Sequence, residues 1–349
     1  MTDYTTLITS EHADKPNFIA TVNLVANGIG DLTSVIQSIP ALYDLDAAVG
    51  SQEDTVGLWV GQPRVVPNVL TLQYFGFSEN GGAADGTQQP FGELGDASVG
   101  APFYELGGAI GTTTLLNDTQ YRTILRAAII RNQYDGSLAQ LEAALLDIFG
   151  VACPVIDPGV RSVVTIVPQA QSQVIQALVS NYDILPRPAA VRNTILFPVS
   201  PLSWTVAGSA TASGTTAQKP SGSDIWDSSA VPGGAEPALY LGWTVPAVAS
   251  LMGGLASSPS TSPSYTTLNF GLYPDASGTV QIFEAGTQIG TYGSYSAGDS
   301  FAVCFDGVNV VYLHNGQIVR VTQTSGSYSP MFCLASAGAE VQNVTLFAP

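Results

Sequence analysis

Between residues 118 and 150, two successive stretches carry apolar residues at the spacing of three and four that places side chains on one helix face. The apolar positions are Tyr121, Ile124, Leu125, Ala128 and Ile129 in the first stretch, and Leu138, Leu141, Leu145, Ile148 and Phe149 in the second. Asp135-Gly136 interrupts the pattern, and Ser137 with Gln140 has the spacing of a capping box. Gly150 is placed to end the second helix. The pattern predicts two amphipathic helices joined by a tight turn.

A longer helix is predicted over residues 14–39, where Asp14 can cap it and Pro16 fits its first turn. Its apolar residues alternate between spacings of four and three, which is heptad spacing, at Phe18, Val22, Val25, Ile29, Leu32, Ile36 and Ile39. Pro40 is expected to end the helix. Because no charge pairs flank these apolar positions, we expect the helix to pack in a bundle rather than to form a free coiled coil.

Residues 43–64 contain a shorter predicted helix. Ser51 and Asp54 have capping spacing at its start, and Gly61 and Pro63 stop it. Leu70–Phe77 has the pattern of a strand, and residues 78–117 form a long Gly-rich segment. A loop of that length in a compact domain is usually functional or is ordered by a neighbour.

Residues 151–199 predict a small β–β–α–β unit. Strands are expected at 151–156 and 160–168, an amphipathic helix at 171–180, and a last strand at 191–197. Together with the preceding helices, this unit predicts an N-terminal α+β domain that combines a helical bundle with a small sheet.

The rest of the chain predicts an all-β domain. Short strands separated by turn residues are expected at 240–245, 266–273, 279–283, 301–305, 309–313 and 317–322. Asp306-Gly307 and Asn315-Gly316 are typical of type I′ hairpin turns. This pattern predicts a β-sandwich of the jelly-roll or lectin-like kind. Residues 203–234 contain few large apolar residues, and there we expect a mobile connection with an early strand around Trp204.

A shift in composition near residues 198–201 divides the chain into two predicted domains, 1–199 and 200–349. The first holds 8 basic and 19 acidic residues, and the second holds 2 and 8, so their balances are −11 and −6. The formal net charge of −17 excludes sequence-independent nucleic-acid binding, which needs clustered Lys and Arg. No apolar run is long enough to predict a membrane span, and residues 1–15 lack the pattern of a signal peptide.

The three cysteines, Cys153, Cys304 and Cys333, are odd in number and far apart, which favours reduced, buried thiols over a disulfide framework or a zinc site. Cys304 and Cys333 both lie in strand-like runs and could be neighbours. Asp44 and Asp46 are better explained as capping or surface residues than as metal ligands, because no third ligand lies at a suitable spacing. We expect no metal and no cofactor.

Three of the ten basic residues, Arg122, Arg126 and Arg131, lie on the first of the two paired helices. Arg122 and Arg126 are four residues apart and stand on one side of it. In so acidic a chain, we expect this basic ridge to face carboxylates, either within the fold or on a partner.

No catalytic constellation is recognisable, and we expect no enzymatic activity. The two histidines lie in different predicted domains, and there is no G-x-S-x-G motif. In the second domain, four aromatic residues could stack on sugar rings if they are exposed, namely Trp226, Trp243, Tyr292 and Tyr295. Packing in the core or at a sheet edge is the alternative for these side chains.

Four segments resemble a family of tail and baseplate proteins of contractile-tailed bacteriophages, encoded after the baseplate J-like gene. They are YTTLITSEHADKPNFIATV at 4–22, YDLDAAVGSQEDTVGLWVGQPR at 43–64, YRTILRAAIIRNQYDGS at 121–137 and LPRPAAVRN at 185–193. The segment QIFEAGTQIGTYGSYSAGDSFAVCFDGVNVVYLHNGQIV at 281–319 resembles concanavalin-type lectin sandwiches found on phage tail proteins.

The resemblance implies a structural, non-enzymatic part of the baseplate wedge, present in several copies around the tail axis of the virion and made in the host cytoplasm. Its implied partners are the J-like wedge protein, hub or sheath-proximal proteins and a tail fibre. The sandwich would then serve as a fibre adaptor or an outward-facing module. The alternative is a receptor-binding protein whose sandwich recognises a host surface carbohydrate. A third possibility, a polysaccharide hydrolase, needs two suitably spaced carboxylates, and the few acidic residues of the second domain give it little support.

Overall fold

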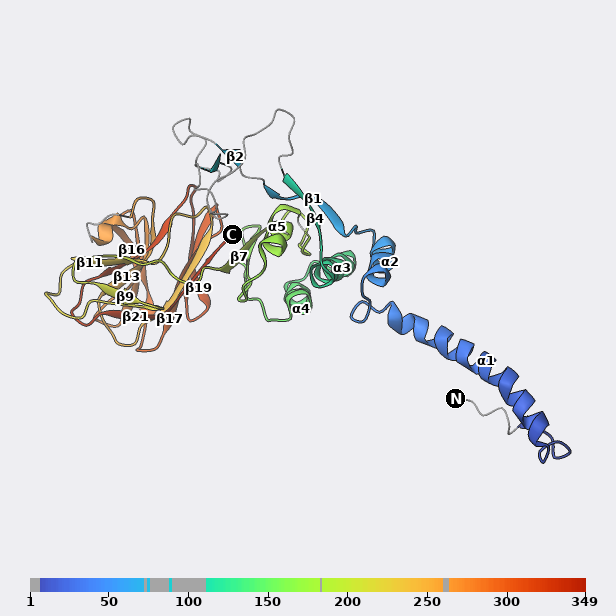
Figure 1. Ribbon diagram of the computed structural model, residues 1–349. Coiled ribbons are helices and arrows are strands. Elements are labelled where there is room, and N and C mark those ends of the chain that lie inside the picture. Colours follow the sequence, from blue (N-terminus) through green and yellow to red (C-terminus); the bar gives the residue numbers. More distant parts are fainter. Residues whose placement is uncertain (1–6, 72–73, 76–87, 90–110, 183, 260–263) are drawn as a thin grey trace, which may run out of the picture. The chain divides into compact units, whose positions relative to one another are not determined.

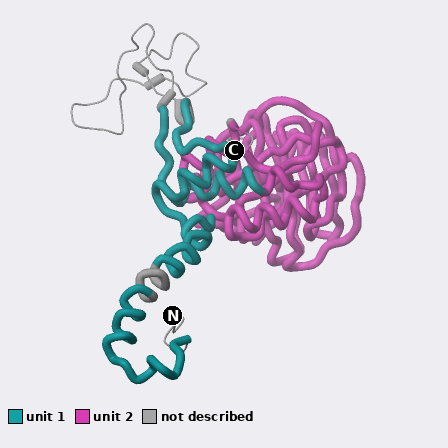
Figure 2. The backbone as a smooth tube through the Cα atoms, turned by 90° about the vertical axis from the view of Figure 1, so that its right-hand side faces the viewer, with its two compact units in different colours: residues 1–129 teal, residues 130–349 magenta. Residues whose placement is uncertain are grey.

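The computed structural model describes residues 7–71, 74–75, 88–89, 111–182, 184–259 and 264–349 (Figure 1). Part of the predicted strand 70–77 and most of the Gly-rich segment 78–117 lie outside the described residues. The chain forms two compact units, residues 1–129 and 130–349, whose boundary falls inside helix α3 (Figure 2). The N-terminal helices and the large β-sandwich both agree with the predicted fold class.

The described residues of unit 1 form three helices and two small sheets. Its elements are α1 (Pro16–Leu42), α2 (Ser51–Val60), β1 (Val65–Thr71), β2 (Tyr74–Phe75), β3 (Gln88–Gln89), β4 (Gly111–Leu115) and most of α3 (Asp118–Gln133). β1 and β4 pair antiparallel, and β2 and β3 pair parallel. A two-stranded sheet buries little on its own, so the stability of this unit must come mainly from its helices and their contacts.

Helix α1 differs from its prediction in three ways. Its N-cap is Lys15, without a side-chain capping bond, and Asp14, which was expected to cap the helix, pairs with the Lys15 ammonium group instead. Pro40 lies inside the helix, which continues to Leu42, because a proline in the last turn removes only one hydrogen bond. Among the residues that the structure describes, no helical bundle covers the apolar stripe. Leu32 is 60 % exposed and Ile36 is 56 % exposed.

The paired helices form as predicted, with one change in the cap. α4 (Leu138–Phe149) begins at Ser137, whose hydroxyl accepts a hydrogen bond from the Gln140 amide at 3.2 Å. The Gln140 side chain does not complete the capping box, because it binds the amide of Asp135 instead of that of Ser137. Gly150 ends α4 in the left-handed conformation at φ 70°.

The β–β–α–β unit is present and continues into the sandwich. It contains β5 (Val155–Ile156), β6 (Ser162–Ile166), α5 (Gln173–Tyr182) and β7 (Arg192–Pro198). β6 and β7 run parallel, and β7 pairs with β21 (Glu340–Ala348) through Phe197 and Pro198. Residues on both sides of the predicted boundary at 199/200 therefore share one sheet, and independent folding of the two parts stays a prediction.

Two sheets of ten and seven strands form the sandwich, with β5–β7 at the end of the larger one. The larger sheet has the order β19–β18–β17–β12–β21–β7–β6–β5, with β10 (Thr216–Gln218) and β9 (Thr211–Ser213) attached to β21. Its other strands are β12 (Leu239–Thr244), β17 (Ser300–Phe305), β18 (Asn309–His314) and β19 (Gln317–Gln323).

The smaller sheet has the order β16–β15–β14–β13–β20–β11–β8. Its strands are β8 (Thr205–Ala207), β11 (Ser228–Val231), β13 (Leu251–Ala256), β14 (Phe270–Pro274), β15 (Thr279–Glu284), β16 (Thr287–Ser294) and β20 (Ser329–Leu334). The core between the sheets contains Trp243, Phe305, Tyr312 and Phe332. As the strand pattern predicts, Val303 and Phe305 face this core together with Val310 and Tyr312.

The sequence underestimates the number of strands. Residues 203–234 were expected to be a mobile connection with one early strand around Trp204. They form that strand as β8, directly after Trp204, and also β9, β10 and β11. The buried Lys219 organises this region, because its ammonium group donates to the carbonyl oxygens of Ser223, Ile225 and Ala335 at 2.7–2.9 Å and pairs with Asp227 at 2.5 Å. Backbone pairing between strands and the hydrogen bonds of the buried Lys219 therefore order this segment, although it contains few large apolar residues.

The turn after β17 is also not the predicted type I′ hairpin. Only Gly307 of the pair Asp306-Gly307 has a positive φ, whereas Asn315 and Gly316 both do, as type I′ requires. The Asp306 carboxylate is fully buried and accepts hydrogen bonds from the amides of Val308 and Asn309 at 2.8 and 2.6 Å. It thus holds a longer turn in place.

The same carboxylate binds β6. The Ser162 hydroxyl donates to Asp306 at 2.6 Å, the Asn309 side-chain amide donates at 2.9 Å, and the Thr194 hydroxyl donates to the Asp306 carbonyl at 3.1 Å. Burial alone would raise the pKa of Asp306, but these hydrogen bonds outweigh it and hold the pKa below its usual value. Asp306 therefore stays ionised while buried.

Side chains of β5–β7 also cover part of the outer face of β17 and β18, which belong to the same sheet. Ile156, Val164 and Leu196 pack with Cys304 and Val311 in a second apolar cluster. Cys333 lies in a different cluster beside Met252 and Met331, so the suggestion that Cys304 and Cys333 are neighbours is wrong. All three cysteines are free and buried, and burial raises the pKa of the Cys153 thiol to about 11.

Replacing Asp306 by Ala should lower the free energy of unfolding of unit 2 by about 3 kcal/mol, because several buried donors lose their charged acceptor. The loss should be full above the unfolded pKa of Asp and should shrink as the pH falls through the depressed native pKa, where Asp306 of the parent is protonated too. Urea unfolding at pH 7 and pH 3 measures this. Asp157→Ala, in an exposed turn, is the control and should change stability by less than about 1 kcal/mol.

A fragment of residues 200–349 should be less stable than one of residues 130–349. The shorter fragment lacks β5–β7 and exposes the apolar cluster around Cys304 and Val311. Thermal unfolding and binding of a hydrophobic dye compare the two fragments. Equal midpoints and equal dye binding would show that the sandwich does not need β5–β7.

Candidate docking site

Arg64, between α2 and β1, is the centre of a polar cluster in unit 1. All five of its N–H groups are used. Nε donates to Asp54 at 2.5 Å, Nη1 donates to Asp118 at 2.6 Å and to the Leu116 carbonyl at 3.2 Å, and Nη2 donates to Glu53 at 3.0 Å and to the Gly50 carbonyl at 3.1 Å. One guanidinium therefore joins both ends of α2 to the start of α3.

The aromatic ring of Tyr121 packs against the Arg64 guanidinium. The Arg64 guanidinium lies 4.5 Å from the centre of the Tyr121 ring, and the Tyr121 hydroxyl donates to the Gln62 carbonyl at 2.5 Å. Gly57 makes this possible, because a Cβ there would stand 1.6 Å from the hydroxyl oxygen. Residue 57 must therefore lack a side chain for α2 and α3 to pack this closely.

The cluster holds more negative than positive charge. Hydrogen bonds from Arg64 hold the pKa of Asp118 below its usual value. Burial raises the pKa of Glu53, and Arg122 and Arg64 offset this only in part. Burial alone would lower the pKa of Arg64, but hydrogen bonds to Asp54 and Asp118 outweigh it and raise the pKa. Arg64 is therefore a permanent cation surrounded by three carboxyl groups.

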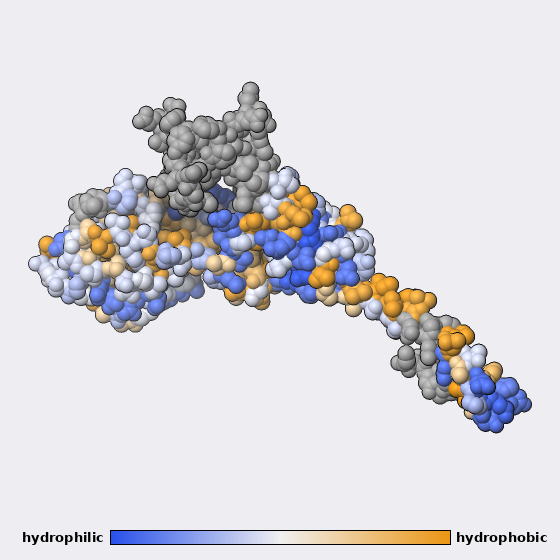
Figure 3. All heavy atoms as spheres, viewed as in Figure 1, coloured by the Kyte–Doolittle hydropathy of each residue, from blue (hydrophilic) through white to orange (hydrophobic). Residues whose placement is uncertain are grey.

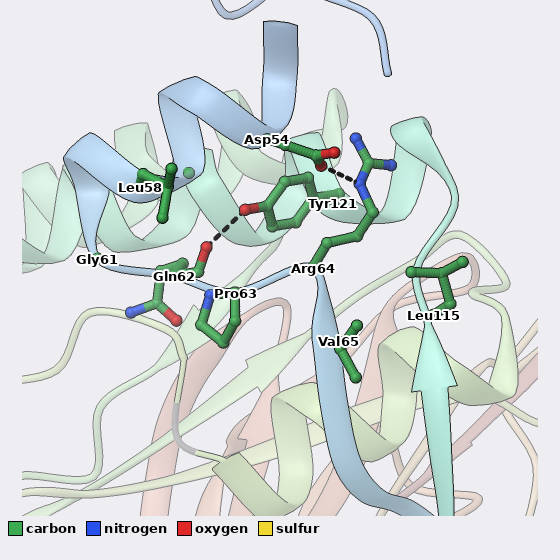
Figure 4. A pocket seen from close by; sticks show the side chains of 10 residues that line it. Asp54, Leu58, Gly61, Gln62, Pro63, Arg64, Val65, Leu115 and Tyr121 are labelled. Carbon is green, nitrogen blue, oxygen red and sulfur yellow. Dashed lines mark hydrogen bonds and ion pairs between the residues drawn. The ribbon is translucent and has the colours of Figure 1, made fainter. Parts of the chain in front are cut away.

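A pocket of about 550 Å³ opens beside this cluster (Figure 4). Leu58 of α2, Val65 of β1 and Leu115 of β4 line it, and their side chains are 81 %, 47 % and 69 % exposed. Asp54 and Arg64 form its polar side (Figure 4). Exposed apolar residues around a hollow, with charges at the rim, are typical of protein–protein contacts.

Two of the predicted basic residues lie near this cluster and are used within unit 1. Arg122 donates to the carbonyls of Leu45 and Ala48 at 2.7 and 2.8 Å and lies 3.7 Å from Glu53. Arg126 forms an ion pair with Asp46. Arg131 belongs to unit 2, at the end of α3. Of the two alternatives for the ridge, carboxylates within the fold account for Arg122 and Arg126.

The four aromatic residues that were considered for sugar contacts lie in different surroundings. Trp243 and Tyr295 are 2 % and 6 % exposed and belong to the core between the sheets, so a sugar cannot stack on them. Of the two alternatives, packing in the core therefore holds for Trp243 and Tyr295, whose side chains point inward because of the alternation of faces along a strand. Tyr292 is partly buried against the same core, and Trp226 packs against Tyr265 and Tyr273.

Sequence reasoning missed Arg64, Glu53 and the role of Tyr121. Ser51 and Asp54 were expected to cap α2, but its first turn is preceded by Gly50, and Asp54 pairs with Arg64. The available signal was a lone arginine after Pro63, close to Glu53 and Asp54 in an acidic chain. The third carboxylate, Asp118, is distant in sequence and could not be assigned.

The model of the family described as bacteriophage baseplate wedge 1 protein matches residues 4–195, more than half of the chain. The chain belongs to this family. Membership gives it a structural place in the tail baseplate, among other baseplate proteins. No curated protein matches it.

Three solved structures that are similar to this wedge-family chain each cover about two fifths of it. One is a human SPRY domain, with 14 % identity, 40 % of this chain and 95 % of that chain covered, and a TM-score of 0.34. Another is the carbohydrate binding module CBM66 from Bacillus subtilis, with 14 % identity, coverage of 42 % and 98 %, and a TM-score of 0.32. A third is the VIP36 exoplasmic/lumenal domain, with 8 % identity, coverage of 43 % and 85 %, and a TM-score of 0.31.

In the described part of the wedge-family chain, no group of three or more His, Cys, Asp and Glu residues is placed to hold a metal ion. No helix of that part is long and apolar enough to cross a membrane.

Replacing Arg64 by Met should destabilise the α2–α3 region by about 3 kcal/mol, because the buried Glu53 loses its closest cation. Arg64→Lys should have a smaller effect, since it keeps the charge and loses the fork. Hydrogen exchange of residues 51–64 and 115–128 measures the loss, with the sandwich as internal reference. Lys15→Met, which removes an exposed ion pair, is the control and should change nothing measurable. Unchanged exchange in Arg64→Met would refute the central role of this residue.

Proposed function

We propose that this chain is a structural component of a contractile-tail baseplate wedge. Unit 1 docks to other baseplate proteins, and the sandwich serves as a tail-fibre adaptor or outward-facing module. Membership of the baseplate wedge family supports this role, and so does the exposed apolar surface of unit 1.

The observation that carries the proposal is the surface of α1. Among its 27 residues only Asp31 is charged, yet large apolar side chains lie open along its length (Figure 3). Leu24 is 79 % exposed, Val25 is 62 %, Val35 is 58 % and Ile39 is 45 %. At 100° per residue, these four residues lie within one arc of about 100°, which is the width of an apolar stripe that packs against a neighbouring surface. We infer that a partner segment covers this face of α1 in the assembled baseplate.

The pocket beside Arg64 provides a second contact on the same unit. Leu58, Val65 and Leu115 offer apolar area, and the cluster behind them has an excess of carboxylates. A partner segment with an apolar side chain for the pocket and a basic residue for its rim would fit. Burial of apolar area contributes roughly 25 cal/mol per Å², so a few such side chains matter to assembly.

The docking role proposed for Arg122, Arg126 and Arg131 is indirect in this scheme. Arg122 and Arg126 order the segment that joins α1 to α2 by binding Leu45, Ala48 and Asp46. Because that segment connects the end of α1 to the start of α2, its conformation sets the direction of α1 relative to α2. The two arginines would therefore position α1 for docking. The proposed partners are the J-like wedge protein, hub or sheath-proximal proteins and a tail fibre, with several copies of the chain around the tail axis.

Replacing both Leu32 and Ile36 by Glu should prevent incorporation of the chain into baseplates while leaving it folded. Both side chains are exposed in the isolated chain, and Glu is a good helix former, so the cost falls on the assembled state. Complementation of a phage that lacks the gene, followed by quantification of the chain in purified particles, measures incorporation.

The matched control is Asn23→Glu with Gln37→Glu, which adds the same charge to polar positions of the same helix. We expect the control chain to enter particles at a level close to the parent. Circular dichroism should show equal helix content in all three chains. Normal incorporation of the Leu32 and Ile36 variant would refute docking through α1.

A further inference from the structure

A hollow of about 160 Å³ lies on the outer face of the larger sheet. Residues of four neighbouring strands line it, including Tyr240, Gly242 and Thr244 of β12, Ser300 of β17, Leu313 of β18 and Asn343 and Thr345 of β21. Tyr240 also packs against the apolar cluster that β5–β7 complete, so the hollow begins at the border of that covered area. Thr345, Asn343 and Ser300 are exposed.

Gly242 shapes the floor of this hollow. A Cβ there would stand 2.7 Å from the Thr345 hydroxyl oxygen, 2.8 Å from Cε1 of Tyr240 and 3.2 Å from the Tyr240 hydroxyl oxygen. The Tyr240 ring therefore lies along the strand over Gly242, and the two hydroxyl groups converge on one point. Glycine in a central strand is unfavourable by itself, and it is found where a ring or a ligand must approach the backbone.

The polar groups of the hollow are only partly satisfied by the protein. Among the described residues, the hydroxyls of Tyr240 and Thr345 have no hydrogen-bond partner. The Asn343 side-chain amide donates to the Thr244 hydroxyl at 3.1 Å, which leaves its own carbonyl oxygen free to accept. Donors and acceptors that point into a hollow without a protein partner are suited to a ligand.

None of the residues that line the hollow is charged, although the chain carries a formal charge of −17. An ionic ligand would therefore find no counter-charge there. A suitable ligand is neutral, small and rich in hydroxyl groups, with an apolar side for the Tyr240 ring. A pyranose sugar has all of these properties, because its ring C–H groups form an apolar face and its hydroxyls both donate and accept.

We propose that this hollow binds one neutral pyranose unit of a glycan. The sugar lies against the Tyr240 ring, and its hydroxyls bind the Tyr240 and Thr345 hydroxyls and the Asn343 carbonyl. These residues differ from the four aromatics singled out from the sequence. The proposal does not depend on docking through α1, because the sugar site and the docking surface belong to different units.

Saturation-transfer NMR with the full-length chain tests the proposal. The probes are glucose, galactose, mannose and N-acetylglucosamine, with glucuronate and N-acetylneuraminate as charged counterparts. At least one neutral sugar should saturate the site with a dissociation constant on the order of 1 mM, and the charged sugars should bind at least about tenfold more weakly.

Ser300→Trp should abolish binding, because the indole would fill the open side of the hollow. Ser294→Trp, at an exposed position at the end of β16, is the matched control and should bind as the parent does. Tyr240→Phe and Thr345→Val each remove a hydroxyl that makes no bond within the protein, so the fold should be unaffected while binding weakens about threefold to tenfold.

Three outcomes would overturn the proposal. The first is that no neutral sugar gives saturable transfer at about fifty times the expected dissociation constant. The second is that Ser300→Trp binds sugar as well as Ser294→Trp does. The third is that neither Tyr240→Phe nor Thr345→Val weakens binding.

Discussion

The structure of unit 1 depends on one guanidinium that serves three carboxylates. Arg64 uses its full set of donors on Glu53, Asp54, Asp118 and two backbone carbonyls, so the ends of two helices and a strand meet at one cation. A lysine has three donors without a fixed fork and could not serve five acceptors in different directions. Since the chain has 10 basic and 27 acidic residues, each buried cation has an unusually large share in the arrangement of its surroundings.

Unit 2 contains the opposite arrangement, a buried anion whose hydrogen-bond donors are neutral groups. Asp306 is surrounded by two backbone amides, a serine hydroxyl and an asparagine amide, and it stays ionised without a cation. Because Ser162 comes from β6, the same contacts that stabilise the charge also fix the β–β–α–β unit against the sandwich. The composition changes near residue 200, but hydrogen bonds such as the one from Ser162 to Asp306 connect residues on both sides of this change.

Local pattern was enough to predict elements whose stability is local. The heptad spacing from Phe18 to Ile39 marked α1, and Ser137 and Gly150 marked the ends of α4. Strands such as β13 and β20 were not predicted, because Gly253, Gly254 and Pro330 interrupt the runs of strand-forming residues. Pairing across the sheet stabilises these strands nevertheless. The Arg64 cluster could not be predicted because Arg64 and Asp118 are 54 residues apart. Exposure of Trp243 depended on which face of β12 turned inward, and alternation alone does not say which.

The position of β21 has a consequence for how the chain is made. This strand, Glu340–Ala348, lies between β12 and β7 in the middle of the larger sheet and also pairs with β10. The sheet can therefore close only after β21 has left the ribosome, whereas α1, with its open apolar side chains, leaves it long before β21 does. At about 5–20 residues per second, α1 is exposed for tens of seconds before its sandwich is complete. Early capture of α1 by a chaperone or by a partner already present would protect the nascent chain from aggregation.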